Sequence, residues 1–394
     1  MRYRKFKADF LFDGKEIFEG NKVLITDKKG IVENIVEEKH AGDDIEIFDG
    51  LISPGFINCH CHLELSHLKN AVESGRGLVN FLIEVIGNRR ALSTEIEEAM
   101  LVADEEMYNN GIVAVGDICN TTDSLKTKLQ SNIRYQNFIE VLGFMEDASQ
   151  RFATYQPVYN AFCEAGFKTN TSIVPHAPYT VSNKMFHLIN KASAGKIVSI
   201  HNQECIAEDE LYKTKAGEFL RLYHHLNINT DFFQAFKTTS LQSYLALLDK
   251  PGTLLLVHNT FSTKEDIDFA LKQTAKTNQQ LYWCLCPNSN LHIENKLPPI
   301  ELLKENNCSI VLGTDSYSSN SSLSILDEIK TMQQNFASLK LNELLSWATL
   351  NGATALNMDD TLGSFGKGKK PGVVLVNNII HKKISEQSTA RKIL

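Results

Sequence analysis

Two histidines separated by one residue, His60 and His62, stand at the end of an apolar run in the segment PGFINCHCHLELS. Alternate side chains of a β-strand point to the same face, so both imidazoles can reach one ion. His201 and Asp315 end two further apolar runs much later in the chain. Three neutral imidazoles and one carboxylate suit Zn²⁺ or Fe²⁺ and leave a position for water. The sequence therefore predicts one divalent metal ion held by these four residues.

Hydrolysis is the reaction expected of such a site. A metal ion lowers the pKa of its bound water from about 16 towards about 7, so hydroxide can attack an electron-poor carbon at neutral pH. Glu204 follows His201 by three residues, where its carboxyl can shuttle a proton to a substrate ring without binding the metal. His258 follows the apolar run TLLLV and could bind a second metal or stabilise the attacking hydroxide. The second use is favoured, because TSIVPHAP offers neither the Lys nor the Glu that bridges two metals in binuclear sites of this sort.

Composition and charge exclude several classes of protein. The chain has 394 residues, 43% of them hydrophobic and 22% charged, as in an ordinary globular protein. Its net charge of −7 argues against a nucleic-acid partner, because binding phosphates needs a positive surface. No apolar stretch follows the basic start MRYRKFKADF, and no run of about 18 apolar residues occurs, so neither export nor a membrane partner is expected. We expect a cytoplasmic protein whose eight cysteines are reduced.

Eight short apolar runs alternate with amphipathic stretches along the middle of the chain. The runs are FINCHCH, GIVAVGDI, RYQNFIEVLG, TSIVPHAP, KIVSIHN, TLLLVHN, LYWCLCP and SIVLGTD. Their continuous apolarity is typical of parallel strands covered on both faces. Eight alternations predict an α/β fold, the (β/α)₈ TIM barrel, in which catalytic groups gather at the C-terminal ends of the strands. Among the helix starts, Ser262 followed by Glu265 has the spacing of a capping box.

The two ends of the chain have a different pattern. KADFLF, KVLIT and IVENIVE are short strand patterns separated by turn signals, and the tail GSFGKGKKPGVVLVNN has the same texture. We expect residues 1–53 and 361–394 to pair into a small β-sandwich domain beside a metal-dependent barrel formed by residues 54–360.

The segments PGFINCHCH, HNQE, VHN, CPNSN and GTDS, in this order and at these strand ends, resemble the amidohydrolase superfamily. They are most similar to its mononuclear deaminases of purines and nucleosides, over about residues 22–376. The segments PHAPYTVS, HLELS and GTDSYSSNSSLSILDE look most like the aminodeoxyfutalosine deaminases of the futalosine route to menaquinone. Methylthioadenosine/S-adenosylhomocysteine deaminases share the first of these three segments and are less similar in the other two.

The resemblance implies a role for each matching residue. In those relatives the four ligands predicted above hold Zn²⁺ or Fe²⁺. The residue matching Glu204 protonates the purine ring, the one matching His258 assists the attacking water, and the one matching Asp315 also passes a proton to departing ammonia. The residue matching His176 would meet the ribose. The implied activity is hydrolytic deamination of a 6-aminopurine nucleoside, 6-aminodeoxyfutalosine above all.

Some candidate substrate contacts have two readings. The residues expected to bind substrate are His176, Glu64, Ser289 and Asn290. Glu64, two residues past His62, could grip a substrate hydroxyl or pair with a neighbour such as Arg76. His292 could touch substrate or pack within its loop.

A bulky substrate fits the long stretch between His201 and His258, which can form helices over the barrel mouth. A substrate carboxylate would need a cationic partner. The sequence does not choose among the five candidates, which are Arg76, Arg89, Arg90, Lys213 and Lys215.

Other functions compatible with the motifs are deamination of methylthioadenosine, S-adenosylhomocysteine, adenosine or guanine, and hydrolysis of another small heterocycle, as by a chlorohydrolase. A non-enzymatic binding protein on the same barrel would usually lose a ligand or the acid, and all six residues are present. We expect a small-molecule substrate and a homodimer.

Overall fold

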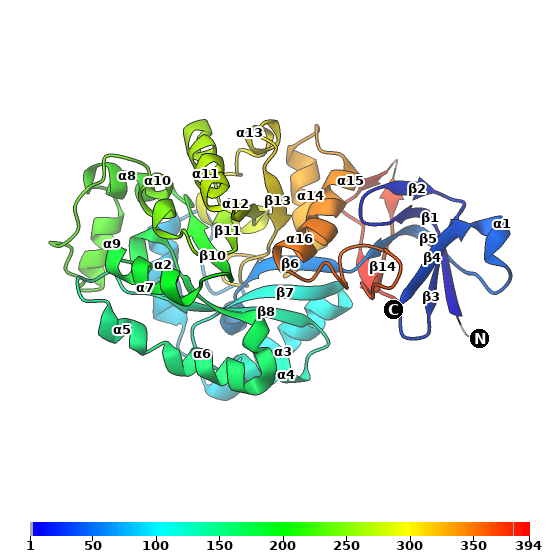
Figure 1. Cartoon of the computed structure of the whole chain (residues 1–394), viewed down its shortest axis with the longest axis horizontal. Coiled ribbons are helices and arrows are strands. Elements are labelled where there is room, and N and C mark those ends of the chain that lie inside the picture. Colours follow the sequence, from blue (N-terminus) through cyan, green and yellow to red (C-terminus); the bar gives the residue numbers. More distant parts are fainter. Residues whose placement is uncertain (1–2, 381) are drawn as a thin grey trace.

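Eight parallel strands form the centre of the larger part of the computed structural model, which describes residues 3–380 and 382–394 (Figure 1). The strands are β6 (Phe56–Cys61), β7 (Ile112–Cys119), β8 (Arg134–Val141), β9 (Thr171–Pro175), β10 (Ile197–Asn202), β11 (Thr253–His258), β12 (Gln280–Leu285) and β13 (Ser309–Leu312). Each of the eight apolar runs forms one of them. Most of their side chains are buried, as continuous apolarity requires.

The strands hydrogen-bond in chain order as two parallel sheets, β6-β7-β8-β9 and β10-β11-β12-β13. The two sheets meet along both free edges. At one edge the His201 N–H donates to the His176 carbonyl at 2.9 Å, and at the other the N–H groups of Thr314 and Asp315 donate to the His60 carbonyl at 3.0 Å. The predicted α/β fold is confirmed, with the strand order of a (β/α)₈ barrel.

Helices connect the strands and surround them in Figure 1. Those outside the β10–β11 connection are α2 (Leu78–Asn88), α3 (Ser93–Asn109), α4 (Leu125–Gln130), α5 (Ser149–Ala153), α6 (Gln156–Phe162), α7 (Asn183–Ala192), α11 (Lys264–Thr277), α12 (Pro287–Glu294), α13 (Ile300–Glu305), α14 (Ile325–Asn335), α15 (Leu341–Ser346) and α16 (Gly352–Ala355). The short helix α1 (Glu38–Ala41) precedes the first barrel strand and lies away from the barrel in Figure 1. No helix within the described ranges is both long and apolar enough to cross a bilayer.

The start of α11 differs from the expected one by one residue. Thr263, not Ser262, is the N-cap, because its hydroxyl accepts from the Asp266 N–H at 3.3 Å while Asp266 Oδ2 accepts from the Thr263 N–H at 3.1 Å. The Ser262 hydroxyl instead donates to Gln203 Oε1 at 2.7 Å. The capping-box prediction at Ser262 was therefore wrong, since that side chain is engaged in a tertiary contact.

Three helices lie between β10 and β11, as expected for a cover over the barrel mouth. They are α8 (Ile206–Thr214), α9 (Phe219–His225) and α10 (Ser240–Tyr244). The Tyr212 hydroxyl donates to the Pro178 carbonyl at 2.8 Å, and the Tyr223 hydroxyl donates to the Tyr179 carbonyl at 2.6 Å. Buried tyrosines thus fasten this cover to the segment that follows β9.

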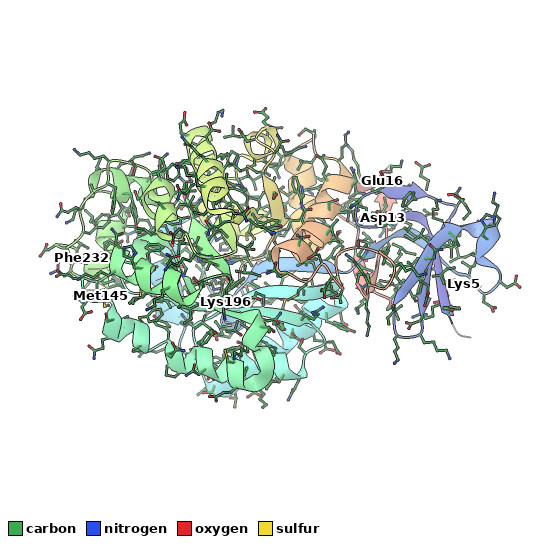
Figure 2. All side chains as sticks on the ribbon, viewed as in Figure 1. Lys5, Asp13, Glu16, Met145, Lys196 and Phe232 are labelled. Atoms are coloured by element: carbon green, nitrogen blue, oxygen red, sulfur yellow. The ribbon has the colours of Figure 1, made fainter. Side chains whose placement is uncertain are left out.

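The two ends of the chain share one sheet beside the barrel, which carries the labelled residues Lys5, Asp13 and Glu16 in Figure 2. Its strands are β1 (Tyr3–Phe12), β2 (Ile17–Glu19), β3 (Lys22–Asp27), β4 (Val32–Glu37), β5 (Glu46–Pro54), β14 (Val373–Val376) and β17 (Ala390–Lys392), with a separate hairpin of β15 (Ile379–Ile380) and β16 (Lys383–Ile384). β14 pairs antiparallel with β5. The expected pairing of the chain ends is confirmed. A sandwich of two layers is not confirmed, and the domain boundaries stay predictions.

A buried ion pair lies under the first strands of the barrel. Lys128 Nζ of α4 is 2.5 Å from Asp117 Oδ2 of β7, and both side chains are inaccessible to solvent. Lys128 Nζ also donates to Asn137 Oδ1 at 2.9 Å. The other oxygen of Asp117 accepts from the N–H of Leu63, the residue after His62, at 2.8 Å. The pair therefore ties α4 and two strands to the segment that carries the first two histidines.

Replacing Lys128 by Met should lower the free energy of unfolding by about 3–5 kcal/mol, because Asp117 is left buried without its counter-charge. Chemical denaturation measures this change. The matched control is Lys126→Met in the same helix, whose ion pair with Glu97 is exposed and should cost less than about 1 kcal/mol. Equal losses in the two variants would contradict a specific role for the buried pair.

Candidate metal centre and active site

Three imidazoles from the ends of β6 and β10 converge on one point. His62 Nε2 lies 3.2 Å from His60 Nε2 and 3.3 Å from His201 Nε2. Asp315 Oδ1 joins them from the end of β13, at 3.4 Å from His62 Nε2 and 3.8 Å from His60 Nε2. The structure thus brings together all four predicted ligands, although they span some 250 residues of sequence.

The spacing of these atoms fits a metal ion. Zn–N bonds of about 2.0–2.1 Å directed to the corners of a tetrahedron put the ligand nitrogens about 3.3 Å apart. Burial, and then the charges of the neighbouring histidines, hold the pKa values of His60 and His62 well below their usual range. Both imidazoles are therefore neutral, which is the form that binds metals.

Hydrogen bonds fix the orientation of two of the ligands. His201 Nδ1 donates to the His176 carbonyl at 2.8 Å, which leaves Nε2 with its lone pair directed at the ion. The second oxygen of Asp315 accepts from the hydroxyls of Ser289 at 2.7 Å and Ser319 at 2.6 Å. Oδ1 alone therefore faces the three imidazoles.

The backbone at two site residues lies in the left-handed region. The φ angle is +73° at His258 and +57° at Asp315. Residues with a Cβ rarely adopt this conformation, and it costs of order 1–3 kcal/mol unless the surroundings impose it. Here the turn out of each strand aims the side chain inward, towards the three histidines.

Glu204 and His258 face each other beside the ligands. Glu204 Oε1 is 3.6 Å from His258 Nε2, and both side chains are buried. Burial, and then the charges of Asp315 and Glu208, raise the pKa of Glu204 well above its usual range, whereas burial lowers the pKa of His258 to about 3. The pair consists of a carboxyl that keeps its proton and an imidazole that stays neutral.

A second group of possible ligands shares His201 with the first. Ligand atoms of Glu140, His176 and His201 lie within 4.8 Å of one another. His201 Nδ1 is already engaged with the His176 carbonyl, and it is 3.8 Å from Glu140 Oε1. A second ion there would have to displace the bond that orients His201, so the arrangement favours one metal ion, as the sequence predicts.

His176 and Glu64 both lie close to the ligands. The His176 ring is 4.7 Å from the His201 ring, and its Nδ1 is 2.9 Å from the Thr180 hydroxyl. The Glu64 carboxylate accepts from the backbone N–H groups of Asn120 and Thr121 at 3.0–3.2 Å.

The prediction that Arg76 could pair with Glu64 was wrong. Arg76 pairs with the exposed Glu73, whereas Arg89 Nη2 lies 3.7 Å from Glu64 Oε2. Arg76 lies in the exposed loop before α2, and Arg89 directly follows that helix. The helix therefore separates the two arginines, and its far end is the one that approaches Glu64. The substrate contact of Glu64 stays a prediction.

Ser289 contacts Asp315, and Asn290 lies beside His258. Ser289 is fully buried with its hydroxyl on Asp315, and Asn290 Nδ2 contacts the Thr260 hydroxyl and lies 3.5 Å from His258 Nδ1. Their contacts orient Asp315 and His258, and their substrate-binding role stays a prediction. His292 contacts the ring of Phe81 edge-on, and its carbonyl accepts from the Gly75 N–H, so its loop-packing reading has structural support.

Four contributing residues carry no distinctive sequence signal. Ser319 holds Asp315, Glu140 stands behind His201, and Asn120 joins Glu140 to Arg89. Ser319 lies in the motif GTDSYSSN, one of several serines there that the sequence cannot tell apart. The other three become visible only when loops from neighbouring strands are brought together.

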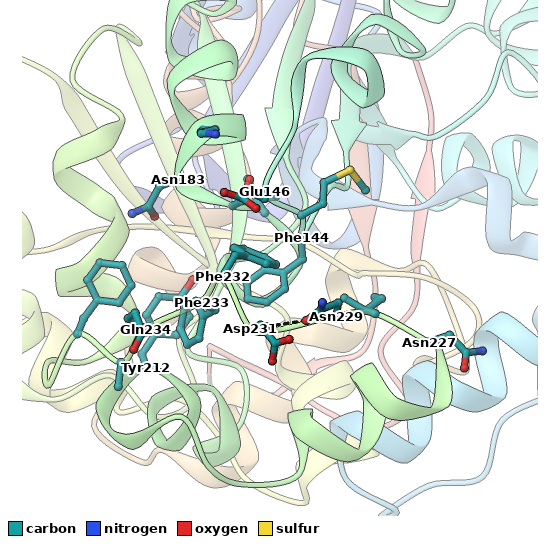
Figure 3. A pocket seen from close by; sticks show the side chains of 17 residues that line it. Phe144, Glu146, Asn183, Tyr212, Asn227, Asn229, Asp231, Phe232, Phe233 and Gln234 are labelled. Atoms are coloured by element: carbon teal, nitrogen blue, oxygen red, sulfur yellow. Dashed lines mark hydrogen bonds between the residues drawn. The ribbon is translucent and has the colours of Figure 1, made fainter.

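A pocket of about 770 Å³ lies apart from the metal ligands. Figure 3 shows Phe144, Phe232 and Phe233 side by side in it, near Tyr212 of the cover. None of the predicted metal or catalytic residues lines it. Figure 2 places its residues Met145 and Phe232 at the end of the molecule remote from the sheet of the chain termini.

Comparison with known proteins agrees with this geometry. The amidohydrolase family model matches residues 51–393. The chain is 27% identical to the adenosine deaminase of Helicobacter pylori, over 79% of this chain and 76% of that protein. It is 26% identical to the aminodeoxyfutalosine deaminase of a Nitratiruptor species, over 91% and 87%. The crystal structure of Helicobacter pylori aminofutalosine deaminase with methylthio-coformycin superposes with a TM-score of 0.80 at 23% identity, covering 97% of this chain and 93% of that one.

The class of protein follows from the fold, the ligand cluster and the family match. The chain belongs to the amidohydrolase family. It is a metal-dependent hydrolase that acts on carbon–nitrogen bonds, and its relatives above carry the names of deaminases.

We expect one divalent ion per chain, measured by elemental analysis. Asp315→Asn keeps the side-chain shape but removes the negative charge, so it should weaken zinc binding in calorimetric titration by at least about 100-fold. Asp123→Asn, an exposed change in the loop after β7, is the control and should leave binding unchanged. Wild-type affinity in the Asp315 variant, or full turnover by metal-free protein, would contradict the site.

Proposed function

We propose that the protein is a hydrolytic deaminase of a 6-aminopurine nucleoside, with 6-aminodeoxyfutalosine as its preferred substrate. The observation that carries the proposal is the pair of Glu204 and His258 beside a single cluster of metal ligands. Deamination of a purine needs a nucleophilic water, a proton for the ring nitrogen and a proton for the departing amine. The site provides a group for each requirement.

The chain's own residues handle the protons. The Glu204 carboxyl, protonated because of its raised pKa, donates to the ring nitrogen next to the carbon under attack. His258 Nε2, which has no hydrogen-bond partner within the described chain, donates to the oxygen of the attacking water and holds it over the ring, because Nδ1 faces the amide nitrogen of Asn290 and accepts from it. Asp315 takes one proton of the water and passes it to the amine, which leaves as ammonia, and the second proton of that water returns to Glu204 as the new carbonyl forms. A divalent ion held by the four ligands would supply the lowered pKa of that water.

The relatives support the choice of substrate class. Proteins named adenosine deaminase and aminodeoxyfutalosine deaminase align over most of the chain, and the aminofutalosine deaminase structure has the same fold. Methylthioadenosine, S-adenosylhomocysteine or adenosine are the alternative substrates. Zn²⁺ or Fe²⁺ as the metal and a homodimer as the assembly are part of the same proposal.

Glu204→Gln should lower kcat by about 10²–10⁴-fold while metal content stays at the wild-type level, because the amide keeps the shape but cannot give up a proton in the same way. Steady-state kinetics and elemental analysis on one preparation measure both quantities. Glu210→Gln, an exposed change in α8, is the matched control and should leave kcat unchanged. Normal turnover by a metal-loaded Glu204 variant would show that Glu204 is structural.

Ammonia release from 6-aminodeoxyfutalosine, methylthioadenosine and adenosine tests the substrate. We expect kcat/KM to be at least about tenfold higher for 6-aminodeoxyfutalosine than for adenosine, which is the effect of losing one charged contact. Equal or better efficiency with adenosine would contradict the specific substrate and leave the deaminase class. Absence of ammonia from every purine would contradict the class as well.

A further inference from the structure

Hydrogen bonds hold both the backbone and the side chain of Arg89 beside the metal centre. It directly follows α2, and its carbonyl oxygen is 3.1 Å from His67 Nε2, which donates to it. Its Nη2 donates to Asn120 Oδ1 at 2.8 Å. The guanidinium is thereby fixed in place before any substrate arrives.

The same guanidinium keeps unused donors. It has five N–H groups in a planar fork, and within the described chain neither Nε nor Nη1 has a hydrogen-bond partner. The Glu64 carboxylate lies 3.7 Å away, beyond hydrogen-bonding distance, and is already satisfied by backbone N–H groups. The Arg89 side chain is 40% exposed, whereas Glu64 is 4% exposed. A solvent-reachable part of the fork is therefore available to a ligand.

Asn120 connects Arg89 to the ligand cluster. Its Nδ2 donates to Glu140 Oε2 at 2.7 Å, and Glu140 Oε1 stands 3.8 Å from His201 Nδ1. Glu64, whose carboxylate accepts from the backbone N–H of the same Asn120, is two residues from His62. The guanidinium therefore lies next to Glu64, which follows the ligand His62. It is separated by the Asn120 side chain alone from Glu140, which stands beside the ligand His201.

The other candidate cations are placed differently. Arg76 is paired with Glu73, and Lys213 of α8 is paired with Asp209. Within the described chain, Arg90 and Lys215 make no ion pair or side-chain hydrogen bond with a site residue.

We propose that Arg89 binds a carboxylate carried by the substrate, so that the enzyme selects 6-aminopurine nucleosides with an anionic substituent. The proposal rests on the deaminase function above and adds its specificity residue. Nη2 gives only one of its two N–H groups to Asn120, so its other N–H and a neighbouring nitrogen of the fork still form one free edge, which matches a carboxylate in bidentate geometry.

Two probes of nearly equal size test the proposal: a 6-aminopurine nucleoside whose sugar substituent ends in a carboxylate, and the methyl ester of that compound. Arg89→Gln should lower kcat/KM for the carboxylate by at least about tenfold, mainly through KM, and change kcat/KM for the ester less than about twofold. Arg89→Lys keeps the charge without the fork and should recover part of the loss. Arg90→Gln, the exposed neighbour, is the control and should change neither substrate.

Binding separates this inference from the proposed function. Calorimetry with the deaminated carboxylate product on zinc-loaded protein should show the same loss in Arg89→Gln, independently of turnover. Equal effects on carboxylate and ester, as expected if Arg89 only met neutral hydroxyls or supported the fold, would overturn the inference, and so would wild-type binding of the product. If wild-type enzyme deaminates neither probe, the proposed function fails, while the binding measurement still decides the role of Arg89.

Discussion

Three imidazole nitrogens and one carboxylate oxygen converge on one point and set the constraint on which the rest of the structure depends, with His62 Nε2 3.2–3.4 Å from each of the other three atoms. Lone pairs aimed at one point repel unless a cation lies between them, so each donor must be held in place by its surroundings. The fold does this with the His176 carbonyl behind His201 and two serine hydroxyls on Asp315. It also places Asp315 in a backbone conformation that a residue with a Cβ rarely adopts. The backbone conformation of Asp315 costs free energy, and the packing of the surrounding barrel must impose it.

The acid and base properties of the site follow from how little water reaches it. Burial raises the pKa of Glu204 and, to about 7, that of Glu64, while it lowers the pKa of His258. Carboxyls therefore tend to keep protons and imidazoles tend to lose them, the reverse of their behaviour in water. Such an inversion suits chemistry in which a carboxyl protonates a weakly basic ring and a neutral imidazole donates a hydrogen bond to the attacking oxygen. Arg89, at the partly exposed margin, is a positive charge next to this environment that solvent can reach, whereas Lys128 is buried against Asp117.

The strands and the metal ligands could be predicted from the sequence because each depends on a signal within a few residues. Continuous apolarity marks a buried parallel strand, and a histidine or aspartate where that run ends marks a ligand at the mouth. The network of Glu64, Asn120 and Arg89 could not be predicted, because it joins loops after two strands and the end of a helix. Arg76 is nearer to Glu64 in the chain than Arg89, yet α2 carries Arg89 to it and leaves Arg76 outside. The contact of the Ser289 hydroxyl with Asp315 could not be predicted either, because the place of Ser289 in a catalytic-face loop does not fix where its side chain points.

The barrel consists of two four-stranded halves, and the ligands are divided equally between them. His60 and His62 belong to the first half, His201 and Asp315 to the second, and the backbone bonds at both seams involve these same residues. An ion held by all four binds only when the halves are joined, so its binding energy is added to the free energy of their association. The metal centre is thus also a clasp, because an ion bound there would further stabilise the joined state of two sheets that already share one hydrophobic core.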